Sequence, residues 1–498
     1  MNVNPITRLD YPDPDVIRVE DTYYMVSTTM HFMPGCEILQ SFDLVHWEHV
    51  TYVYETLDHT DAQQLKSGQN IYGQGMWAAS LRYHEGRFYI CFVANDTRKT
   101  YLYTSEKIDG PWKKQLIEGF YHDASLLFDE DGRNYIVYGN DEIWITELNE
   151  DLTAPKKDGL HRLLVSDHKN PELGYEGSHI QKINGYYYIF LIHSLRDRWM
   201  RTEACFYSDS LEGEFTGGDV LCDDRGYCGQ GVAQGGIVDT PDGKWYAMLF
   251  QDSGAVGRLP ILLPVTWKDH FPVFGQNGHV PEEIEVHSTR PGYIYQPLVG
   301  SDDFCNGLLP RWQFNHDPDP QYYHLDALQG TYTITTREVC TELTQAVNTL
   351  TQRMSYPSCA AEVTVDASAL KDGDVAGLCA FQGCYAAVGI TKHHGKYEVL
   401  MLDKKEDGIL DMTEGTVVES HQMDFRLEAD FCNMKDEARC YYRVNKGDWL
   451  PIGTVHKLYF KLDHFTGCRF GLFCYAAEET GGSACFRDFK YYDVDEIS

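Results

Sequence analysis

The sequence predicts an all-β protein, a five-bladed β-propeller followed by an antiparallel β-sandwich. A hairpin unit recurs through the first part of the chain, where long amphipathic helical patterns are hard to find. After about residue 300, strand-like runs continue without that repeat. A length of 498 residues also exceeds one ordinary core. We place the propeller at residues 1–295 and the sandwich at residues 300–498.

Each repeat consists of a short apolar strand, a tight turn and an aromatic strand. The turns are Glu20-Asp21, Glu85-Gly86, Asp131-Gly132, Asn184-Gly185 and Asp242-Gly243. Asp-Gly and Asn-Gly favour a type I′ hairpin turn, because this turn needs positive φ at both positions. The copies start 46 to 64 residues apart, which is typical of propeller blades. A sandwich with irregular hairpins is the alternative, but it has no reason to keep a constant offset within each unit.

One position keeps that constant offset. It lies nine residues before the turn glycine in the four internal copies and holds Trp77, Asp123, Glu176 and Gln234. In the first copy Asp13 lies eight residues before Asp21, so its equivalence needs a one-residue adjustment. Equivalent positions at the start of the innermost strands surround one end of a propeller's central channel. The sequence therefore predicts that three carboxyls, an aromatic ring and an amide share one pocket.

Three carboxyls in one poorly hydrated pocket suit glycosidic hydrolysis. The reaction needs an acid to protonate the leaving oxygen and a carboxylate to activate water or attack the anomeric carbon. A third carboxyl can keep the acid protonated. The chain has 75 Asp and Glu residues, so any one of them alone would be interpreted as a solvated or turn-capping side chain. Three at one repeat position favour a function, since buried carboxyls are costly unless paired or used.

Most of the first 180 residues resemble family 43 of the glycoside hydrolases. The matching motifs are Asn4-Pro5-Ile6, Tyr11-Pro12-Asp13-Pro14-Asp15, Ser41-Phe42-Asp43-Leu44 with Trp47, Trp77-Ala78, His122-Asp123-Ala124-Ser125 and Glu176-Gly177-Ser178-His179. The resemblance implies inverting hydrolysis of arabinofuranosyl or xylosyl links. It implies Asp13 as general base, Glu176 as general acid and Asp123 as the carboxyl that tunes and orients the acid. The tail resembles the concanavalin-like sandwich that many members carry.

Five further residues are predicted to bind substrate: His31, Phe32, Trp77, Gln234 and Arg258. Trp77 would form a wall under the sugar, with core packing as the alternative. Arg258 resembles an arginine that binds sugar hydroxyls and a carboxylate in relatives, with a surface salt bridge as the alternative. His31 and Phe32 belong to a loop near Asp13 that would line the pocket.

The sequence does not decide whether the protein binds a metal ion, and we expect no cofactor to be required. Many relatives have a histidine where this chain has Gln234, which puts a channel metal in doubt, although a Gln carbonyl can still bind Ca²⁺. Asp302, Asp303 and Asp488 are candidate ligands for a structural Ca²⁺, with solvated loop acids as the alternative.

Charge and cysteine usage limit the partners and the compartment. The formal net charge of −33 argues against nucleic acid and anionic membranes, and suits a neutral oligosaccharide. No apolar run approaches the roughly 20 residues that span a bilayer. The first residues lack a secretory signal pattern, and fifteen cysteines lack any Cys-x-x-Cys pair. We therefore expect a cytoplasmic protein, with a trimmed secreted chain as the alternative; the oligomeric state stays open.

The leading hypothesis is an exo-acting, inverting hydrolase that removes terminal α-L-arabinofuranosyl residues from hemicellulose-derived oligosaccharides of arabinoxylan, arabinan or xyloglucan. A β-xylosidase acting on xylo-oligosaccharides is the second, because both sugars are pentoses of similar size. A non-catalytic carbohydrate-binding protein is the third, but a binding protein gains nothing from a desolvated Asp–Asp–Glu cluster. We expect the sandwich to cover the propeller face and narrow the pocket; polysaccharide targeting is its alternative role.

Overall fold

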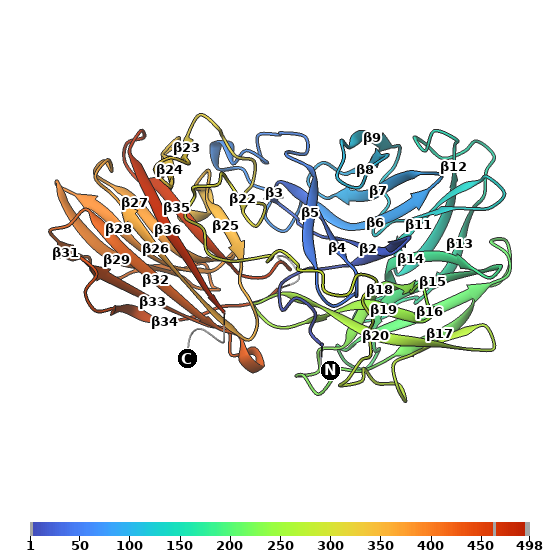
Figure 1. The fold of residues 1–498 in the computed structure, drawn as a ribbon. Helices are drawn as coiled ribbons and strands as arrows, with labels where there is room; N and C mark the ends of the chain where they lie inside the picture. Colours follow the sequence, from blue (N-terminus) through green and yellow to red (C-terminus); the bar gives the residue numbers. More distant parts are fainter. Residues whose placement is uncertain (1–2, 462–464, 494–498) are drawn as a thin grey trace.

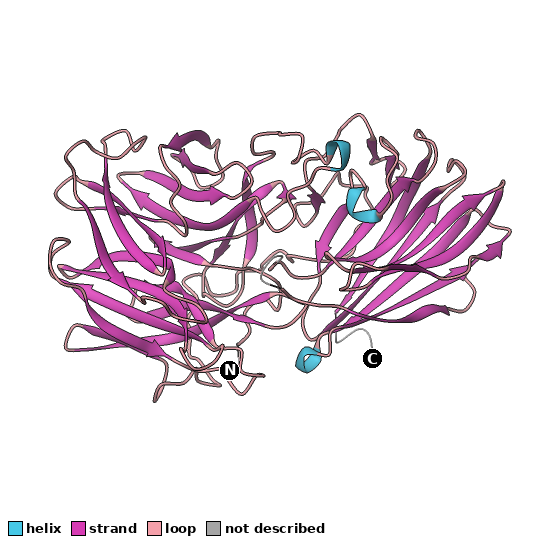
Figure 2. Cartoon of the chain, turned by 180° about the vertical axis from the view of Figure 1, so that it is seen from behind, coloured by secondary structure: helices cyan, strands magenta, loops and turns pink. Residues whose placement is uncertain are grey.

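The computed structural model describes residues 3–461 and 465–493, and it confirms the all-β fold class. A five-bladed propeller and a β-sandwich lie side by side (Figure 1). Among the described residues the helices are short 3-10 turns, η1 (Lys66–Gly68), η2 (Leu343–Gln345) and η3 (Cys432–Met434) (Figure 2). None of them is long or apolar enough to cross a membrane. The outer limits predicted for the domains, residues 1 and 498, lie outside the described residues.

Each blade is a four-stranded antiparallel sheet whose strands follow the chain order. The first blade comprises β1 (Asp15–Val19), β2 (Thr22–Ser27), β4 (Gly35–Ser41) and β5 (Glu48–Tyr54). The second comprises β6 (Met76–His84), β7 (Arg87–Ala94), β8 (Lys99–Ser105) and β9 (Lys113–Ile117). The third comprises β10 (Ser125–Phe128), β11 (Asn134–Asn140), β12 (Glu142–Leu148) and β13 (His161–Ser166). The fourth comprises β14 (Glu176–Ile183), β15 (Tyr186–Ser194), β16 (Arg201–Ser208) and β17 (Thr216–Leu221). The fifth comprises β18 (Val232–Asp239), β19 (Trp245–Asp252), β20 (Arg258–Lys268) and β21 (Phe271–Phe274).

Neighbouring blades share apolar cores, and these cores form a ring around the channel. Alternate side chains of each sheet face the next blade, as the period of two in a strand requires. Leu81 and Ile90 of the second blade, for example, pack with Ile38 of the first. Four comparable clusters join the other blade pairs. Burial between blades therefore fixes their order and their distance from the axis.

The ring is closed by the chain's first segment, which runs beside β20. Asn4 exchanges two hydrogen bonds with Leu262, one donated by its Nδ2 to the Leu262 carbonyl at 2.7 Å. The amide of Ile6 donates to the Pro260 carbonyl at 2.8 Å. These bonds join the first and last blades, so the N-terminal motif belongs to the closure of the propeller.

The four predicted hairpin turns that contain glycine are of two kinds. Glu85-Gly86 and Asn184-Gly185 are two-residue turns with positive φ at both positions, as predicted. The turns at Gly132 and Gly243 belong instead to five-residue loops, because β10 ends at Phe128 opposite Asn134 and β18 ends at Asp239 opposite Trp245. In these loops only the glycine of the pair has positive φ. The type I′ prediction is therefore wrong for these two turns.

At the opposite end of the inner strands, the repeat position coincides with irregular backbone. The register of β6, β14 and β18 shifts directly after Trp77, Glu176 and Ala233. Asp13 and Asp123, which stand just before β1 and β10, have φ of 52° and 48°. Bulges and left-handed residues redirect side chains, and they are common beside active sites. Here they turn side chains into the channel mouth.

A buried ionic network holds the middle of the channel. Asp15 on β1 accepts hydrogen bonds from Arg82 Nη1 at 2.8 Å and from the Leu81 amide at 2.7 Å, and it lies 3.0 Å from His179 Nδ1. The Arg82 guanidinium also donates to Ser125 Oγ and to the carbonyls of Leu126 and Ile180. The network therefore joins the inner strands of four blades.

The sandwich consists of two sheets around a large apolar core. One sheet contains β23 (Tyr323–Asp326), β24 (Thr331–Thr335), β26 (Ser358–Asp366), β32 (Gln422–Asp430), β33 (Glu437–Val444), β34 (Leu450–Lys457) and β36 (Ser483–Asp493). The other contains β22 (Gln313–Asn315), β25 (Leu350–Arg353), β27 (Asp374–Phe381), β28 (Tyr385–His393), β29 (Lys396–Lys404), β30 (Leu410–Met412), β31 (Thr416–Val418) and β35 (Arg469–Ala476). This second sheet also includes β3 (Phe32–Met33), a strand from a propeller loop that pairs with β22.

We predict that Asp15→Asn destabilises the protein by about 3–5 kcal/mol at pH 7, because it leaves the buried Arg82 charge without its partner. Burial opposes ionisation of Asp15, but Arg82 and His179 together lower its pKa below the ordinary 3.8. Its contribution is thus complete above about pH 4 and is lost as the pH falls through the lower folded-state pKa. Chemical denaturation at several pH values measures the difference, which should shrink in acid.

The matched control is Asp131→Asn, at an exposed Asp–Arg pair whose side chains are both 44% accessible. Such a pair contributes at most about 1 kcal/mol. Equal effects of the two substitutions would contradict the central role of the Asp15 network.

Candidate active site

The channel mouth encloses a cavity of about 160 Å³. All five repeat-position residues line it: Asp13, Trp77, Asp123, Glu176 and Gln234. The other lining residues are His122, Leu173, Trp199, Arg201, Arg258 and Phe465. Residues from five blades and from the sandwich thus meet around a space of the size of one small ring.

Asp13 is fixed by two donors. Its Oδ1 accepts a hydrogen bond from Arg258 Nη1 at 2.6 Å, and its Oδ2 accepts one from Thr28 Oγ1 at 2.6 Å. The side chain is only 4% exposed, so its orientation is set by the protein rather than by solvent. Both partners donate hydrogen bonds to Asp13. These bonds fix the carboxylate in an orientation at the cavity wall, where it can accept a further proton or hydrogen bond.

Asp123 and Glu176 line the same cavity, and His122 lies close to both of them. The amide of Gly177 donates to Asp123 Oδ2 at 2.9 Å, and Asn140 Nδ2 donates to Glu176 Oε2 at 2.7 Å. His122 Nε2 lies 3.5 Å from Asp123 Oδ2 and 3.4 Å from Glu176 Oε2. The two carboxyls are therefore coupled through one imidazole.

The environments of these groups move their pKa values apart. Burial, together with the charges of Glu176 and Asp13, raises the pKa of Asp123 to about 6, against the lowering effect of His122. Burial also tends to raise the pKa of Glu176, but its hydrogen bond to His122 and the nearby positive charges lower it overall. Burial lowers the pKa of His122, yet the surrounding carboxylates raise it to about 9. The resemblance assigns the acid role to Glu176, whereas the raised carboxyl pKa belongs to Asp123.

Two arginines, Arg201 of the fourth blade and Arg258 of the fifth, also line the cavity. Asp252 lies between them, 2.9 Å from Arg201 Nε and 3.3 Å from Arg258 Nε. The Arg258 guanidinium also stacks on Phe250 and Phe465, at 4.5 and 4.2 Å from the ring centres. Both arginines are buried, so these charges are screened less than surface charges are.

Aromatic side chains form the rest of the wall. Trp77 packs edge-to-face against Phe465, with ring centres 4.9 Å apart. Phe465 comes from the sandwich, directly after the undescribed residues 462–464. Leu173 and Trp199 come from loops of the fourth blade, on either side of β14 and β15. The sandwich thus narrows a pocket that the propeller alone would leave wider.

Asp10 attaches the loop that carries Phe465. It is fully buried and accepts two backbone hydrogen bonds at 2.7 Å each, from Arg258 to its Oδ1 and from Gly467 to its Oδ2. Burial raises its pKa to about 6 although these bonds oppose the shift. A β-carbon at Gly467 would lie 2.0 Å from the Val256 carbonyl oxygen, so the glycine permits this close approach.

Gln234 forms the floor of the cavity beside Glu176. Its backbone is left-handed, with φ of 60°, and its backbone amide donates a hydrogen bond to Glu203 Oε2 at 2.7 Å. Burial raises the pKa of Glu203 well above its ordinary value. A side chain at Gly177 would meet Gln234 Cγ at 2.7 Å, which explains the glycine that follows Glu176.

His31 and Phe32 do not line this cavity, which corrects the prediction made for them. Phe32 belongs to β3 and pairs with Asn315 of the sandwich, and the guanidinium of Arg469 lies 3.5 Å from its ring centre. The His31 ring packs against Phe32 and His316, and both residues are almost completely inaccessible. Strand pairing directs this loop into the domain interface.

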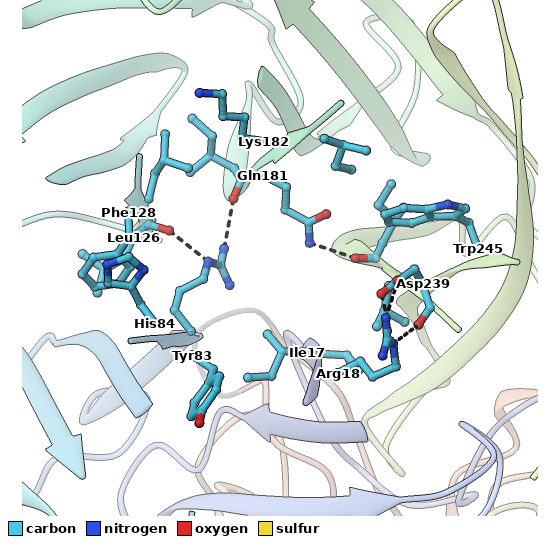
Figure 3. Close-up of a pocket in the computed structure, with 17 residues that line it drawn as sticks. Ile17, Arg18, Tyr83, His84, Leu126, Phe128, Gln181, Lys182, Asp239 and Trp245 are labelled. Atoms are coloured by element: carbon cyan, nitrogen blue, oxygen red, sulfur yellow. Dashed lines mark hydrogen bonds and ion pairs between the residues drawn. The ribbon is translucent and has the colours of Figure 1, made fainter. Parts of the chain in front are cut away.

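A second cavity, of about 400 Å³, lies at the other end of the channel, where the inner strands end (Figure 3). Its charged groups already have partners. Arg18 Nη2 donates to Asp239 Oδ2 at 2.5 Å, and Lys182 Nζ donates to Asp129 Oδ1 at 2.7 Å. It lacks the converging carboxyls of the first cavity, so we place the chemistry at the first.

Two of the three candidate Ca²⁺ ligands in the sandwich accept hydrogen bonds in this structure. Asp302 accepts hydrogen bonds from the Phe304 amide and from Trp312 Nε1, each at 2.8 Å, and Asp303 accepts one from the Cys305 amide at 2.9 Å. Within residues 3–461 and 465–493, no group of three or more close metal-ligating side chains includes Asp302, Asp303 or Asp488. Turn capping accounts for Asp302 and Asp303.

Sequence reasoning missed five residues that line the cavity. His122 was noted only as part of the motif around Asp123, although its position beside a repeat residue was a usable signal. The repeat covers only the two inner strands of each blade. It therefore gave no signal for Leu173, which precedes β14, or for Trp199 and Arg201, which follow β15. Phe465 had no signal in the sequence, because its contact with Trp77 joins two domains.

The comparisons with known proteins agree with this architecture. The model of glycosyl hydrolases family 43 matches residues 3–272. The model of the beta xylosidase C-terminal concanavalin A-like domain matches residues 301–492. A bifunctional GH43-CE protein from Bacteroides eggerthii has a similar structure, with a TM-score of 0.92 and 42% identity over 98% of this chain and 63% of that one. This chain therefore spans less than two thirds of that protein.

Two relatives with different names complete the comparison. The beta-xylosidase of Formosa agariphila is 27% identical, with 99% of this chain and 89% of its own length covered. The non-reducing end alpha-L-arabinofuranosidase of Bacteroides ovatus is 25% identical, with 66% of this chain and 63% of its own length covered. From the match over residues 3–272 and the carboxyls gathered at the channel mouth, we conclude that the chain belongs to family 43 of the glycoside hydrolases and hydrolyses O-glycosyl bonds.

Proposed function

We propose that the protein is an exo-acting, inverting hydrolase that releases one terminal pentosyl residue, in the first place α-L-arabinofuranosyl, from hemicellulose-derived oligosaccharides. The observation that carries this proposal is the size of the cavity around Asp13, Asp123 and Glu176. At about 160 Å³ it is smaller than the roughly 300–1,000 Å³ of sites for drug-sized ligands. We therefore take the cavity to bind one terminal sugar ring.

The proposed roles are those that the family resemblance implies, together with the contacts of each carboxyl. Asp13, held by Arg258 and Thr28, is the general base that takes a proton from water. Glu176 is the general acid that protonates the leaving oxygen. Asp123, which faces Glu176 through His122, tunes and orients the acid. Inversion requires base and acid on opposite faces of the sugar, with room for the water.

Release of β-D-xylosyl residues is the second candidate. The relative of which this chain covers 89% is named a beta-xylosidase, whereas the arabinofuranosidase is matched over 63% of its length. Both sugars are pentoses, and a few hydroxyl contacts decide between them. The choice of arabinofuranose rests on residues 11–35, YPDPDVIRVEDTYYMVSTTMHFMPG, which resemble family members assigned to that activity.

We expect higher kcat/KM on nitrophenyl α-L-arabinofuranoside than on nitrophenyl β-D-xyloside. Because the mechanism inverts, the first sugar observed by NMR should have the anomeric configuration opposite to that of the substrate. Higher activity on the xyloside would replace the first candidate by the second. Retention of configuration would reject Asp13 as the base.

Replacement of the acid, Glu176→Gln, should lower kcat on arabino-oligosaccharides by about 10²- to 10⁴-fold while substrate binding is largely kept. The loss should be smaller on nitrophenyl glycosides, because a good leaving group needs less protonation. The exposed Glu172→Gln, four residues away, is the matched control and should retain activity. If the Glu176 variant kept full turnover of the oligosaccharides, the acid assignment would be rejected.

Removal of the sandwich wall, Phe465→Ala, should raise KM by roughly 2- to 10-fold, the range expected for one aromatic packing contact. It should also relax the preference for terminal residues, since the cavity loses the ring that faces Trp77. Leu328→Ala, at a side chain of the sandwich that is 94% exposed, is the control. Unchanged kinetics with branched and linear substrates would show that Phe465 does not shape the site.

A further inference from the structure

His122 occupies a place that the acid and base roles leave unexplained. Its Nε2 faces Glu176 Oε2 at 3.4 Å and Asp123 Oδ2 at 3.5 Å, and its side chain is 22% exposed at the cavity wall. The backbone holds it in place, because the Gly139 amide donates to the His122 carbonyl at 3.0 Å. One imidazole nitrogen thus faces both carboxyls of the acid side.

The distribution of protons among these three side chains creates a problem for the acid. With a pKa of about 6, Asp123 is mainly ionised at neutral pH, and the lowered pKa of Glu176 keeps that group ionised as well. His122, with a pKa of about 9, is protonated. The proton that an acid would need is therefore on the imidazole, next to the carboxylate that must deliver it.

The charges around this pair explain where the proton rests. Burial lowers the pKa of His122, but the carboxylates of Asp123, Glu176 and Asp13 raise it by a larger amount. Arg201 and Arg258 act on Glu176 and favour its carboxylate form. A sugar that fills the cavity removes water, and a charged pair then becomes less favourable relative to a neutral imidazole beside a neutral carboxylic acid. This change conserves the total number of protons in the cluster.

We propose that His122 is a positioning residue that stores the proton which Glu176 delivers to the leaving oxygen. The inference rests on the proposed function. A proton moves from His122 Nε2 to Glu176 Oε2 and then to the glycosidic oxygen, as the bond from that oxygen to the anomeric carbon breaks. The water oxygen forms the new bond to that carbon and gives one proton to Asp13. Solvent then takes this proton from Asp13 and returns one to His122.

The first test is the pH profile of kcat/KM for His122→Gln, which retains a hydrogen-bond donor but does not titrate. In the native enzyme the alkaline limb reflects loss of the stored proton. In the variant it should move to lower pH by at least about one unit, because Glu176 then loses its own proton directly. The shift should be large with arabino-oligosaccharides and small with nitrophenyl glycosides. His46→Gln, at an exposed histidine paired with Asp43, should leave the limb in place.

Two outcomes of this kinetic test would overturn the proposal. One is an unshifted alkaline limb in a His122→Gln variant with native thermal stability. The other is a loss of activity that is uniform over pH and over leaving groups, which would indicate a purely structural role. If Glu176→Gln kept its turnover, the proposed function itself would fail; if that variant collapses while the limb stays fixed, only the role of His122 fails.

A second measurement does not depend on the folding of a variant at His122. NMR titration of the histidine side chains in the intact native enzyme should give His122 a pKa well above the ordinary value. The same titration in Glu176→Gln should give a lower value, because one of the two facing carboxylates is gone. A neutral His122 at pH 7 in the native enzyme would overturn the proposal.

Discussion

The ion pair between Asp15 and Arg82 is the constraint on which the channel depends. It joins the innermost strands of the first two blades, and the remaining donors of Arg82 reach the third and fourth. Charges buried at the centre of a propeller are costly unless their geometry is satisfied. Here the satisfied geometry fixes the distance between strands that begin beside the carboxyls, because Asp13 and Asp123 lie two residues before Asp15 and Ser125, and Glu176 lies three before His179. The stability of the core and the arrangement of the pocket therefore have a common origin.

The backbone at the channel mouth adds a second constraint. Asp13, Asp123 and Gln234 all adopt left-handed conformations that side-chain-bearing residues seldom use. Each is held by the surrounding structure, as when the Glu203 carboxyl accepts the amide of Gln234. The packing of the propeller offsets the free-energy cost of these backbone conformations. The result is that the three side chains point into one cavity from positions fixed by the strands.

The sequence predicted the parts of this arrangement that are periodic. A constant offset from each turn brought Trp77, Asp123 and Glu176 to one end of the channel, because a propeller converts sequence repetition into rotation about an axis. The turns at Gly132 and Gly243 were predicted less well, since an Asp-Gly pair fits both a two-residue turn and the end of a longer loop. His31 and Phe32 were misplaced because a two-residue strand that pairs with another domain has no local signature. The same reason hid Phe465, whose contact with the pocket depends on how the domains dock.

The pairing of β3 with β22 adds a strand from a propeller loop to one sheet of the sandwich. Domains joined by a linker alone are expected to move relative to one another, but main-chain pairing across the boundary resists such motion. The sandwich of another family member could therefore not simply replace this one in a chimeric protein. The donor would have to match the short propeller strand as well as the connector.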